Sequence, residues 1–189
     1  KVTGSHDPYK IQSICLTIYS NPGLGKTSLA FTASRPLLLD FDGGAYRADN
    51  RGDTVIVRDW GDVAGIERGD VEGYDTIIID TVGKALESLT QDILRRNSRL
   101  GWGGALNQQG WGQLGVQFRS FMSKIKGFGK DVILISHMDE QRDGDQTRER
   151  LKIPGATQGL VLTDSDSIGR ISIVDQRLRR RALAKTRRA

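Results

Sequence analysis

Short, almost continuous apolar runs recur along the chain and alternate with stretches that have helical spacing. Five of these runs predict β-strands, and they cover residues 11–20, 36–40, 54–57, 76–80 and 132–136. Three intervening stretches predict helices, and they cover roughly residues 26–34, 83–98 and 113–126. Strands that are apolar on both sides suit a sheet that is buried on both faces. The alternation therefore predicts an α/β fold with a mostly parallel central sheet flanked by helices.

Two polar stretches fit neither a strand nor a helix. Residues 97–112 are rich in Gly, Asn and Gln yet contain two Trp, and residues 138–150 are almost wholly polar. Long loops inside a compact domain are usually functional or disordered, and we expect both stretches to be loops of this kind. Beyond Pro154 the sequence predicts a short helix and then a strand over residues 168–174.

The composition fits a single domain with a buried core. The chain has 189 residues, 37% of them hydrophobic, and we expect one domain over residues 11–176 after a disordered leader or tag remnant over residues 1–10. Cys15 is the single cysteine and there are two histidines, which excludes an internal disulfide and disfavours a zinc site. No apolar run approaches the roughly 20 residues of a membrane span, and no signal peptide pattern opens the chain, so we expect a cytoplasmic protein.

The net charge of +5 is concentrated in one segment. Residues 177–189 hold seven basic residues and no acid, which leaves 21 basic against 23 acidic residues elsewhere, a net charge of −2. A basic segment of this kind is either a solvated tail without a partner or a segment that contacts nucleic acid. The charge pattern leaves both interpretations open.

A glycine-rich motif follows the first predicted strand. Residues 20–27 read SNPGLGKT and match the phosphate-binding P-loop pattern, except that Ser20 replaces the first glycine. The backbone N–H groups of such a loop point at phosphate, Lys26 reaches the β- and γ-phosphates, and the Thr27 hydroxyl binds Mg²⁺. ATP and Mg²⁺ are therefore the expected cofactors. The residues expected to bind the nucleotide are Asn21, Pro22, Gly23, Leu24, Gly25, Lys26, Thr27 and Ser28.

Carboxylates stand at the ends of two predicted strands. Asp80 ends the run of residues 76–80, where a P-loop protein needs an acid near the metal, so we assign Asp80 to Mg²⁺ through water. AAA-type ATPases usually place a glutamate directly after this aspartate, but Thr81 follows here, and the acid that activates water must lie elsewhere. Asp42, after the second strand, is the candidate general base and Asp40 is the alternative. Both could instead cap the turn that follows.

His137 follows the fifth predicted strand. In an open α/β sheet ligands bind at the carboxyl ends of the strands, which is where His137 is expected. A polar residue at this place can respond to the γ-phosphate and relay its loss to the loop that follows. The alternative is a histidine bonded to a nearby backbone group.

The order of these parts resembles the RecA-like ATPases, and most closely the small phage-encoded RecA-like proteins of the Sak recombination and single-strand annealing group. The resemblance spans about residues 11–175 and is carried by the motifs NPGLGKT, LLLDFDGG, IIIDT and LISH. It implies a RecA-like P-loop core, with the base at Asp42 where RecA has Glu and a phosphate sensor at His137 where RecA has Gln. It also places residues 97–112 and 138–150 at the positions of two DNA-binding loops.

Partners also follow from the resemblance. It implies head-to-tail self-assembly as a ring or filament, in which a neighbouring protomer supplies a cation to the nucleotide. Arg150 and Lys152 are the nearest candidates for this trans-acting role, and plain surface charges are the alternative. Single-stranded DNA is the implied ligand, with a single-strand binding protein as a further partner and no membrane.

The two polar stretches differ as candidates for DNA binding. Residues 138–150 hold five acids against three arginines, which is a poor electrostatic match to phosphate. Residues 97–112 are the better candidate because tryptophans can stack on bases and arginines flank them. The tryptophans could instead anchor the loop to the core or to a neighbouring subunit. The expected DNA-binding residues are Arg95, Arg96, Arg99, Trp102 and Trp111.

Three functions are compatible with the sequence. The leading hypothesis is an ATPase that binds single-stranded DNA, is stimulated by it, and supports phage homologous recombination or strand annealing. One alternative is a P-loop kinase of a small molecule, and another is a nucleotide-gated assembly or motor module with a protein partner. A GTPase is disfavoured because the chain has no N-K-x-D motif.

Overall fold

A computed structural model of the chain describes residues 11–143 and 146–173, so the expected leader (residues 1–10) and the basic tail (residues 177–189) lie outside the described residues. The main sheet contains the strands β1 (Cys15–Ser20), β2 (Pro36–Asp40), β3 (Asp53–Ile56), β4 (Thr76–Asp80), β7 (Asp131–Asp143), β8 (Gln146–Leu151) and β9 (Ser167–Arg170). The helices are α1 (Lys26–Ala30), α2 (Gly61–Ala64), α3 (Val82–Arg96), α4 (Gln108–Gly127) and α5 (Gly155–Asp164). The short elements are the 3₁₀ turns η1 (Ala45–Arg47), η2 (Gly69–Val71) and η3 (Ser98–Leu100) and the strands β5 (Gly101–Trp102) and β6 (Ala105–Leu106).

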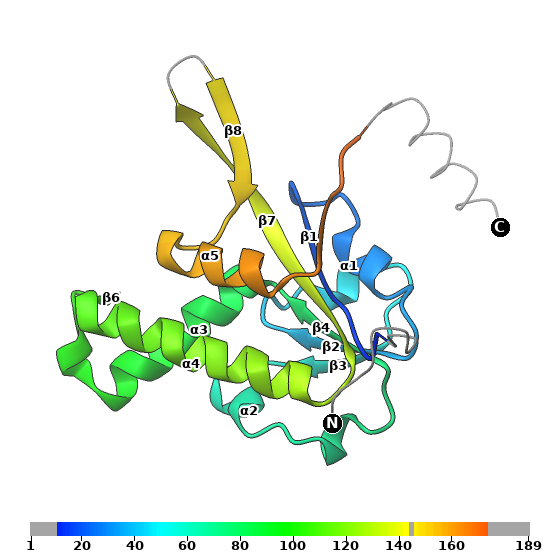
Figure 1. Cartoon of the computed structure of the whole chain (residues 1–189), viewed down its shortest axis with the longest axis horizontal. Helices are drawn as coiled ribbons and strands as arrows, with labels where there is room; N and C mark the ends of the chain where they lie inside the picture. Colours follow the sequence, from blue (N-terminus) through cyan, green and yellow to red (C-terminus); the bar gives the residue numbers. More distant parts are fainter. Residues whose placement is uncertain (1–10, 144–145, 174–189) are drawn as a thin grey trace, which may run out of the picture.

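The strand β7 lies between β1 and β4 in the sheet. The strand order is β3-β2-β4-β7-β1-β9, these neighbours are parallel, and β8 pairs antiparallel with the outer part of β7. The register aligns His137 with Ser20, and Asp40 with Asp80. The carboxyl ends of β2, β4 and β1 therefore stand at the same edge, which β7 crosses at His137 before it continues into its pairing with β8 (Figure 1). The predicted α/β fold with a mostly parallel sheet flanked by helices is confirmed.

Alternate residues of the buried strands face two separate cores. In β2, Leu37 and Leu39 join the larger core and Leu38 joins the smaller one. The larger core also receives side chains from α2, α3, α4 and α5, whereas α1 packs on the smaller core (Figure 1). Burial on both faces explains why the strands appear in the sequence as continuous apolar runs.

The predicted strands are present, with shifted ends for several of them. The runs at residues 36–40 and 76–80 coincide with β2 and β4, and β1 begins at Cys15 rather than at residue 11. The strand predicted over residues 168–174 is the shorter β9. No helix within the described ranges has both the length and the apolar character needed to traverse a bilayer.

The helix predicted over residues 26–34 is shorter than expected, because α1 ends at Ala30. The chain enters β2 at Pro36, and a residue that precedes proline is disfavoured in the helical conformation. Arg35 instead has a φ of 36° and forms an ion pair with Asp75 at 2.6 Å. The residues after Ala30 therefore serve the turn between the helix and the sheet.

The prediction of a loop over residues 97–112 is wrong for its last part, because α4 begins at Gln108. Asn107 caps the helix, and its Oδ1 accepts a hydrogen bond from the Gly110 backbone N–H at 2.9 Å. A Cβ on Gly110 would lie 2.4 Å from the backbone oxygen of Leu100. The glycine that weakens the helical pattern is therefore needed for the close approach of α4 to η3. The preceding residues form η3 and the small β5–β6 hairpin.

The prediction of a loop over residues 138–150 is also wrong for its described part, because residues 138–143 and 146–150 form the paired strands of a hairpin arm. The last six residues of β7 pair with β8, from Met138 opposite Leu151 to Asp143 opposite Gln146. The arm projects beyond the carboxyl edge of the sheet, past α5 (Figure 1). Met138 and Leu151 are buried at its base. The described side chains of the arm beyond them join neither core, so its sequence lacks the alternation that reveals a strand.

The buried thiol of Cys15 provides a test of the position of β1. Cys15 is 1% exposed, and burial raises the pKa of its thiol to about 11. Because the thiolate is the reactive form, we expect the thiol to be protected from alkylating reagents at pH 8 in the folded protein and to react readily in denaturant. The measurement is the rate of modification with and without guanidinium. Similar rates in both conditions would contradict a buried β1.

Candidate nucleotide site

The loop between β1 and α1 has the backbone conformation that the phosphate-binding motif requires. Gly23 and Gly25 have φ angles of 76° and 81°, in the left-handed region that favours glycine. Lys26 opens α1 and is 6% exposed. Its Nζ donates hydrogen bonds to the backbone oxygens of Ser20 and Asn21, each at 3.1 Å. The ammonium group therefore holds the two ends of the loop together.

Ser20 contributes to this loop through its side chain. The Ser20 hydroxyl accepts a hydrogen bond from Lys26 Nζ at 3.2 Å and donates one to the Asn21 backbone oxygen at 3.0 Å. The residue that replaces the first glycine of the motif thus adds a ligand to the lysine. Burial lowers the pKa of Lys26, and the nearby carboxylates of Asp80 and Asp42 act against that shift. These acids favour the charged form of the lysine.

Asp80 and Thr27 meet below the loop. Thr27 Oγ1 donates a hydrogen bond of 2.6 Å to Asp80 Oδ2, which links the start of α1 to the end of β4. Asp80 is 5% exposed, and burial raises its pKa to about 6 even though the hydrogen bond from Thr27 lowers it. A buried carboxylate with a raised pKa is typical of a site that is completed by a ligand.

The two oxygen ligands fit a magnesium ion. Mg²⁺ prefers carboxylate and hydroxyl oxygens and keeps several waters or phosphate oxygens in its shell. Thr27 and Asp80 supply two such oxygens beside the phosphate-binding loop. Among the described residues, no group of three or more His, Cys, Asp or Glu side chains could hold a metal ion. A magnesium ion at this site would therefore depend on the phosphates of a nucleotide, as in P-loop proteins.

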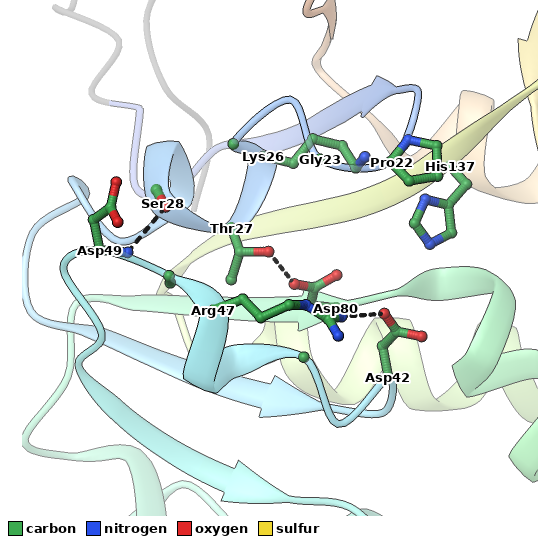
Figure 2. A pocket seen from close by; sticks show the side chains of 13 residues that line it. Pro22, Gly23, Lys26, Thr27, Ser28, Asp42, Arg47, Asp49, Asp80 and His137 are labelled. Carbon is green, nitrogen blue, oxygen red and sulfur yellow. Dashed lines mark hydrogen bonds and ion pairs between the residues drawn. The ribbon is translucent and has the colours of Figure 1, made fainter. Parts of the chain in front are cut away.

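Asp40 and Asp42 have different surroundings although they are two residues apart. Asp40 is 3% exposed, and its carboxylate accepts hydrogen bonds from the backbone N–H groups of Asp42, Gly44 and Ala45 at 3.0–3.2 Å. Asp40 therefore fixes the turn after β2. Asp42 is turned toward the phosphate-binding loop, and of the two acids it is the one that lines the cavity there (Figure 2). The geometry favours Asp42 over Asp40 as the residue that reaches a bound ligand.

The predicted catalytic residues surround one cavity of about 500 Å³. Figure 2 shows Asp80 at its centre, with Asp42 and His137 to one side and Ser28 and Asp49 to the other. Of the eight predicted nucleotide-binding residues, Asn21 and Leu24 do not line the cavity. The residues that line it are Pro22, Gly23, Gly25, Lys26, Thr27, Ser28, Asp42, Gly44, Arg47, Ala48, Asp49, Asp80 and His137.

His137 lines the cavity on the same side as Asp42 (Figure 2). It is half-buried on β7, directly opposite Ser20 in the strand register. Its Nδ1 is buried and has no hydrogen-bond partner among the described residues. Burial lowers the pKa of His137, and the charge of Lys26 lowers it further, so the neutral imidazole is favoured. A neutral imidazole with a free nitrogen can donate to or accept from a ligand in the cavity.

Four residues that line the cavity were missed in the sequence, and two of them, Arg47 and Asp49, are charged. Arg47 ends η1, and its Nη2 lies 3.6 Å from Asp42 Oδ2. Asp49 follows two residues later, and its backbone N–H donates to Ser28 Oγ at 3.3 Å. Both follow β2 at the edge of the sheet where ligands bind, which is the signal that could have identified them.

The candidate DNA-binding arginines are partly neutralised by a buried acid. Arg95 Nη2 and Arg96 Nε lie 2.6 Å and 2.8 Å from the carboxylate of Asp92, whose side chain is 1% exposed. Arg95 also lies 3.9 Å from Asp59. These two arginines hold the end of α3 and offer less positive charge to a ligand than the sequence indicates. Arg99 is exposed.

The two tryptophans have different environments. Trp102 is 91% exposed at the tip of the β5–β6 hairpin, where Gly103 and Gly104 have positive φ angles. Trp111 lies in the first turn of α4 and is 38% exposed. Trp102 is therefore available for stacking, whereas Trp111 belongs to the helix.

The trans-acting candidates lie outside the cavity. Arg150 is on β8, opposite Asp139 in the arm. Lys152 is exposed and follows the arm, and its backbone N–H donates to the His137 oxygen at 2.8 Å. The backbone of Lys152 therefore ties the base of the arm to the residue predicted to sense phosphate.

Comparisons with known proteins extend these observations. A family model described as an AAA domain matches residues 12–188. Among solved structures, the chain resembles a KaiC-like protein from the hyperthermophilic archaeon Pyrococcus horikoshii OT3, with 10% identity over 72% of this chain and 76% of that one and a TM-score of 0.40. It also resembles a prototypical ATPase from the type III secretion system of pathogenic bacteria, with 12% identity over 86% of this chain and a TM-score of 0.51. The match spans 51% of that ATPase. The comparison with curated proteins finds no match.

The raised pKa of Asp80 predicts a stability change with a defined sign. At pH values above about 6 the carboxylate is ionised in both states, and burying it costs the folded protein on the order of 2–3 kcal/mol. Asp80→Asn should therefore raise the free energy of unfolding of the nucleotide-free protein at pH 8. The gain should shrink as the pH falls through 6 toward 4, where the wild-type carboxyl becomes neutral in both states. Denaturant titrations at several pH values measure this difference.

Asp75 provides a control of opposite sign. Hydrogen bonds from Arg35 hold the pKa of Asp75 well below its usual range, so Asp75→Asn should lower stability at pH 8, and this loss should persist at pH 4 and shrink only at still lower pH. An Asp80→Asn protein that is less stable than wild type at pH 8 would contradict the account of this buried acid.

Proposed function

The chain belongs to the AAA domain family, and we propose that it binds Mg²⁺ and ATP in the cavity at the carboxyl edge of the sheet and hydrolyses the ATP. The observation that carries the proposal is the convergence of four side chains from four elements on one cavity. Lys26 comes from α1, Asp42 follows β2, Asp80 ends β4 and His137 lies on β7. This set provides a positive charge for the phosphates, a base for the attacking water, a metal ligand and a polar residue that senses the γ-phosphate.

The side chains divide the chemistry between them. Lys26 exchanges its bonds to the loop oxygens for bonds to the β- and γ-phosphates, since charge-assisted bonds to phosphate are stronger. Thr27 and Asp80 would hold Mg²⁺, which when bound neutralises charge on the phosphates. Asp42 accepts the proton of the attacking water. Asp40 is fixed by three backbone N–H groups and keeps Asp42 in position.

His137 is placed to couple the nucleotide to the hairpin arm. His137 lines the cavity, its buried Nδ1 has no hydrogen-bond partner among the described residues, and its backbone lies in the same strand that continues into the arm. The bond from the Lys152 N–H to the His137 oxygen secures the second strand of the arm at the same point. A shift of His137 on loss of the γ-phosphate would therefore move the base of the arm.

The proposed ligand of the ATPase is single-stranded DNA, and the proposed role is phage homologous recombination or strand annealing. Support comes from Trp102, an almost fully exposed indole on a narrow hairpin, three residues after the exposed Arg99. Exposed aromatic side chains next to arginine are typical of surfaces that stack bases without reading their sequence. The pairing of Arg95 and Arg96 with Asp92 narrows this surface to Trp102 and Arg99.

Self-assembly head to tail, as a ring or a filament, is part of the proposal. Support comes from the arm, which projects beyond the edge that carries the nucleotide site (Figure 1). Arg150 on this arm and Lys152 at its base lie outside their own cavity, as expected for cations that serve a neighbouring protomer. Light scattering with and without nucleotide tests whether assembly depends on ATP.

Substitutions at two residues test the proposed hydrolysis. Lys26→Ala should abolish nucleotide binding, because it removes the buried positive charge that binds the phosphates. Asp42→Asn should retain ATP binding and lose turnover by about 100-fold or more, because an amide cannot accept the proton. The measurements are binding of a fluorescent ATP analogue and release of phosphate.

Glu87→Gln serves as the matched control for the acid-to-amide change, since Glu87 is exposed on α3 and pairs with Lys84 outside the cavity. Full turnover by Asp42→Asn would remove Asp42 from the mechanism. Transfer of phosphate to a small-molecule acceptor would favour the kinase alternative.

The DNA part of the proposal is tested by Trp102→Ala. Base stacking contributes about 1–3 kcal/mol per base, so the affinity for an unstructured oligonucleotide should fall roughly 5- to 150-fold at low salt. Trp102→Phe should retain most of the affinity. Ile56→Ala, a change of another exposed apolar residue on β3, should have no effect. Fluorescence anisotropy measures the binding, and a wild-type protein that binds no single-stranded DNA at low salt would overturn this part.

A further inference from the structure

Arg47 is a second cation of the nucleotide cavity, and its role is not explained by the site described above. The side chain is 60% exposed and extends from η1 toward Asp42 (Figure 2). Its Nη2 lies 3.6 Å from Asp42 Oδ2, and its guanidinium carbon lies 5.2 Å from the centre of the Tyr46 ring. Lys26 and Arg47 are the lysine and arginine residues that line the cavity within the described ranges.

The turn after β2 is built so that Arg47 can reach Asp42. The carboxylate of Asp40 accepts hydrogen bonds from three backbone N–H groups of this turn, those of Asp42, Gly44 and Ala45, which fixes the start of η1. Gly43 has a φ of 63°, in the region that favours glycine. A Cβ on Gly44 would lie 2.5 Å from Arg47 Nη2 and 3.4 Å from Asp42 Oδ2. The absence of a side chain at Gly44 therefore opens the path between the guanidinium and the carboxylate.

The contact between Arg47 and Asp42 is loose enough to be exchanged. Charge-assisted hydrogen bonds between nitrogen and carboxylate are about 2.7–2.9 Å long, so 3.6 Å is an ion pair without a good hydrogen bond. Ion pairs with a solvent-exposed partner contribute little to the stability of the fold. A guanidinium binds two phosphate oxygens at once and matches their geometry better than an ammonium group does. Phosphate oxygens in the cavity would therefore compete successfully for Arg47.

We propose that Arg47 is a phosphate ligand that acts within its own chain: it pairs with Asp42 before the nucleotide binds and moves to the γ-phosphate of ATP afterwards. This inference rests on the proposed ATPase function. The exchange adds positive charge at the γ-phosphate and leaves both oxygens of Asp42 free for the attacking water. Lys26, held deep in the loop, serves the same phosphates from the opposite side.

In the hydrolytic step, water attacks the γ-phosphate while Arg47 and Asp42 occupy these positions. The water oxygen forms a bond to the γ-phosphorus, and its proton passes to the Asp42 carboxylate. The bond between the γ-phosphorus and the bridging oxygen breaks, and the electron pair stays on the β-phosphate of ADP. Arg47 stabilises the charge of the transferring phosphoryl group, as arginines do in other phosphoryl-transfer sites.

The test compares Arg47→Ala and Arg47→Lys with the control Arg51→Ala. Arg51 is an exposed arginine four residues further along, and it does not line the cavity. Arg47→Ala should weaken Mg²⁺–ATP binding about 10- to 100-fold and leave ADP binding almost unchanged, because the lost bonds go to the γ-phosphate. It should lower kcat by about 100-fold or more, because an arginine that stabilises the charge of the transferring phosphoryl group raises the rate roughly 10³- to 10⁵-fold.

Two further variants distinguish a role of Arg47 in phosphate binding from a general effect on the protein. Arg47→Lys keeps the charge without the two-pronged geometry and should recover part of the ATP affinity but little of kcat. Arg51→Ala should match wild type in both measurements, and thermal unfolding of each variant checks that the fold is intact. If Arg47→Ala matches Arg51→Ala while wild type hydrolyses ATP, the inference fails and the proposed function stands.

A faster Arg47→Ala protein would also overturn the inference, because Arg47 would then only restrain Asp42. Equal losses of ATP and ADP affinity would place Arg47 on another part of the nucleotide and would overturn it too. A wild-type protein that neither binds nor hydrolyses ATP would remove the proposed function and this inference together.

Discussion

The parallel register of β1, β7 and β4 is the constraint on which the site depends. Hydrogen bonds between these buried strands fix His137 opposite Ser20 and place the end of β4 one strand away. Because side chains alternate along a strand, a slip of one residue would turn Asp80 and His137 toward the opposite layers. The two cores on either side of the sheet prevent such a slip, since each strand buries different apolar residues in each of them. The packing that stabilises the fold therefore also sets the positions of the polar groups.

The same sheet edge concentrates buried polar groups, and three of them have local partners. Lys26 binds loop oxygens, Asp80 accepts from Thr27, and Asp40 accepts from three backbone N–H groups. Burial nevertheless raises the pKa of Asp80, which indicates that its ionised form is not fully compensated. A site of this kind is preorganised for a ligand that supplies the missing charge. A bound cation and the phosphates of a nucleotide would supply it.

The sequence predicts most of this arrangement because its signals are local. An apolar run followed by a glycine-rich loop and a lysine identifies the first strand, the loop and the helix, and an apolar run that ends in Asp80 identifies the metal-side acid. Apolar patterning cannot reveal the hairpin arm, because its described side chains beyond Met138 and Leu151 join neither core. Gly110 makes the start of α4 resemble a loop in the sequence, although this glycine serves the close packing of α4 and not a turn.

The sequence also does not reveal which charged side chains pair with one another. The pairing of Arg95 and Arg96 with Asp92 depends on one turn of α3 and on the burial of the acid, and it reduces the surface expected for DNA. The distinction between Asp40 and Asp42 depends on which carboxylate the turn encloses. Arg47 carries no motif, and only the turn after β2 brings it to the cavity.

The proposed function requires that one nucleotide occupies the cavity between the phosphate-binding loop, Asp42, Asp80 and His137. The decisive measurement is an experimental structure of the wild-type protein with Mg²⁺ and a non-hydrolysable ATP analogue. We expect Lys26 on the β- and γ-phosphates, Mg²⁺ beside Thr27 and Asp80, and the γ-phosphate facing both Asp42 and His137. A nucleotide bound elsewhere, or one whose γ-phosphate points away from Asp42, would contradict it.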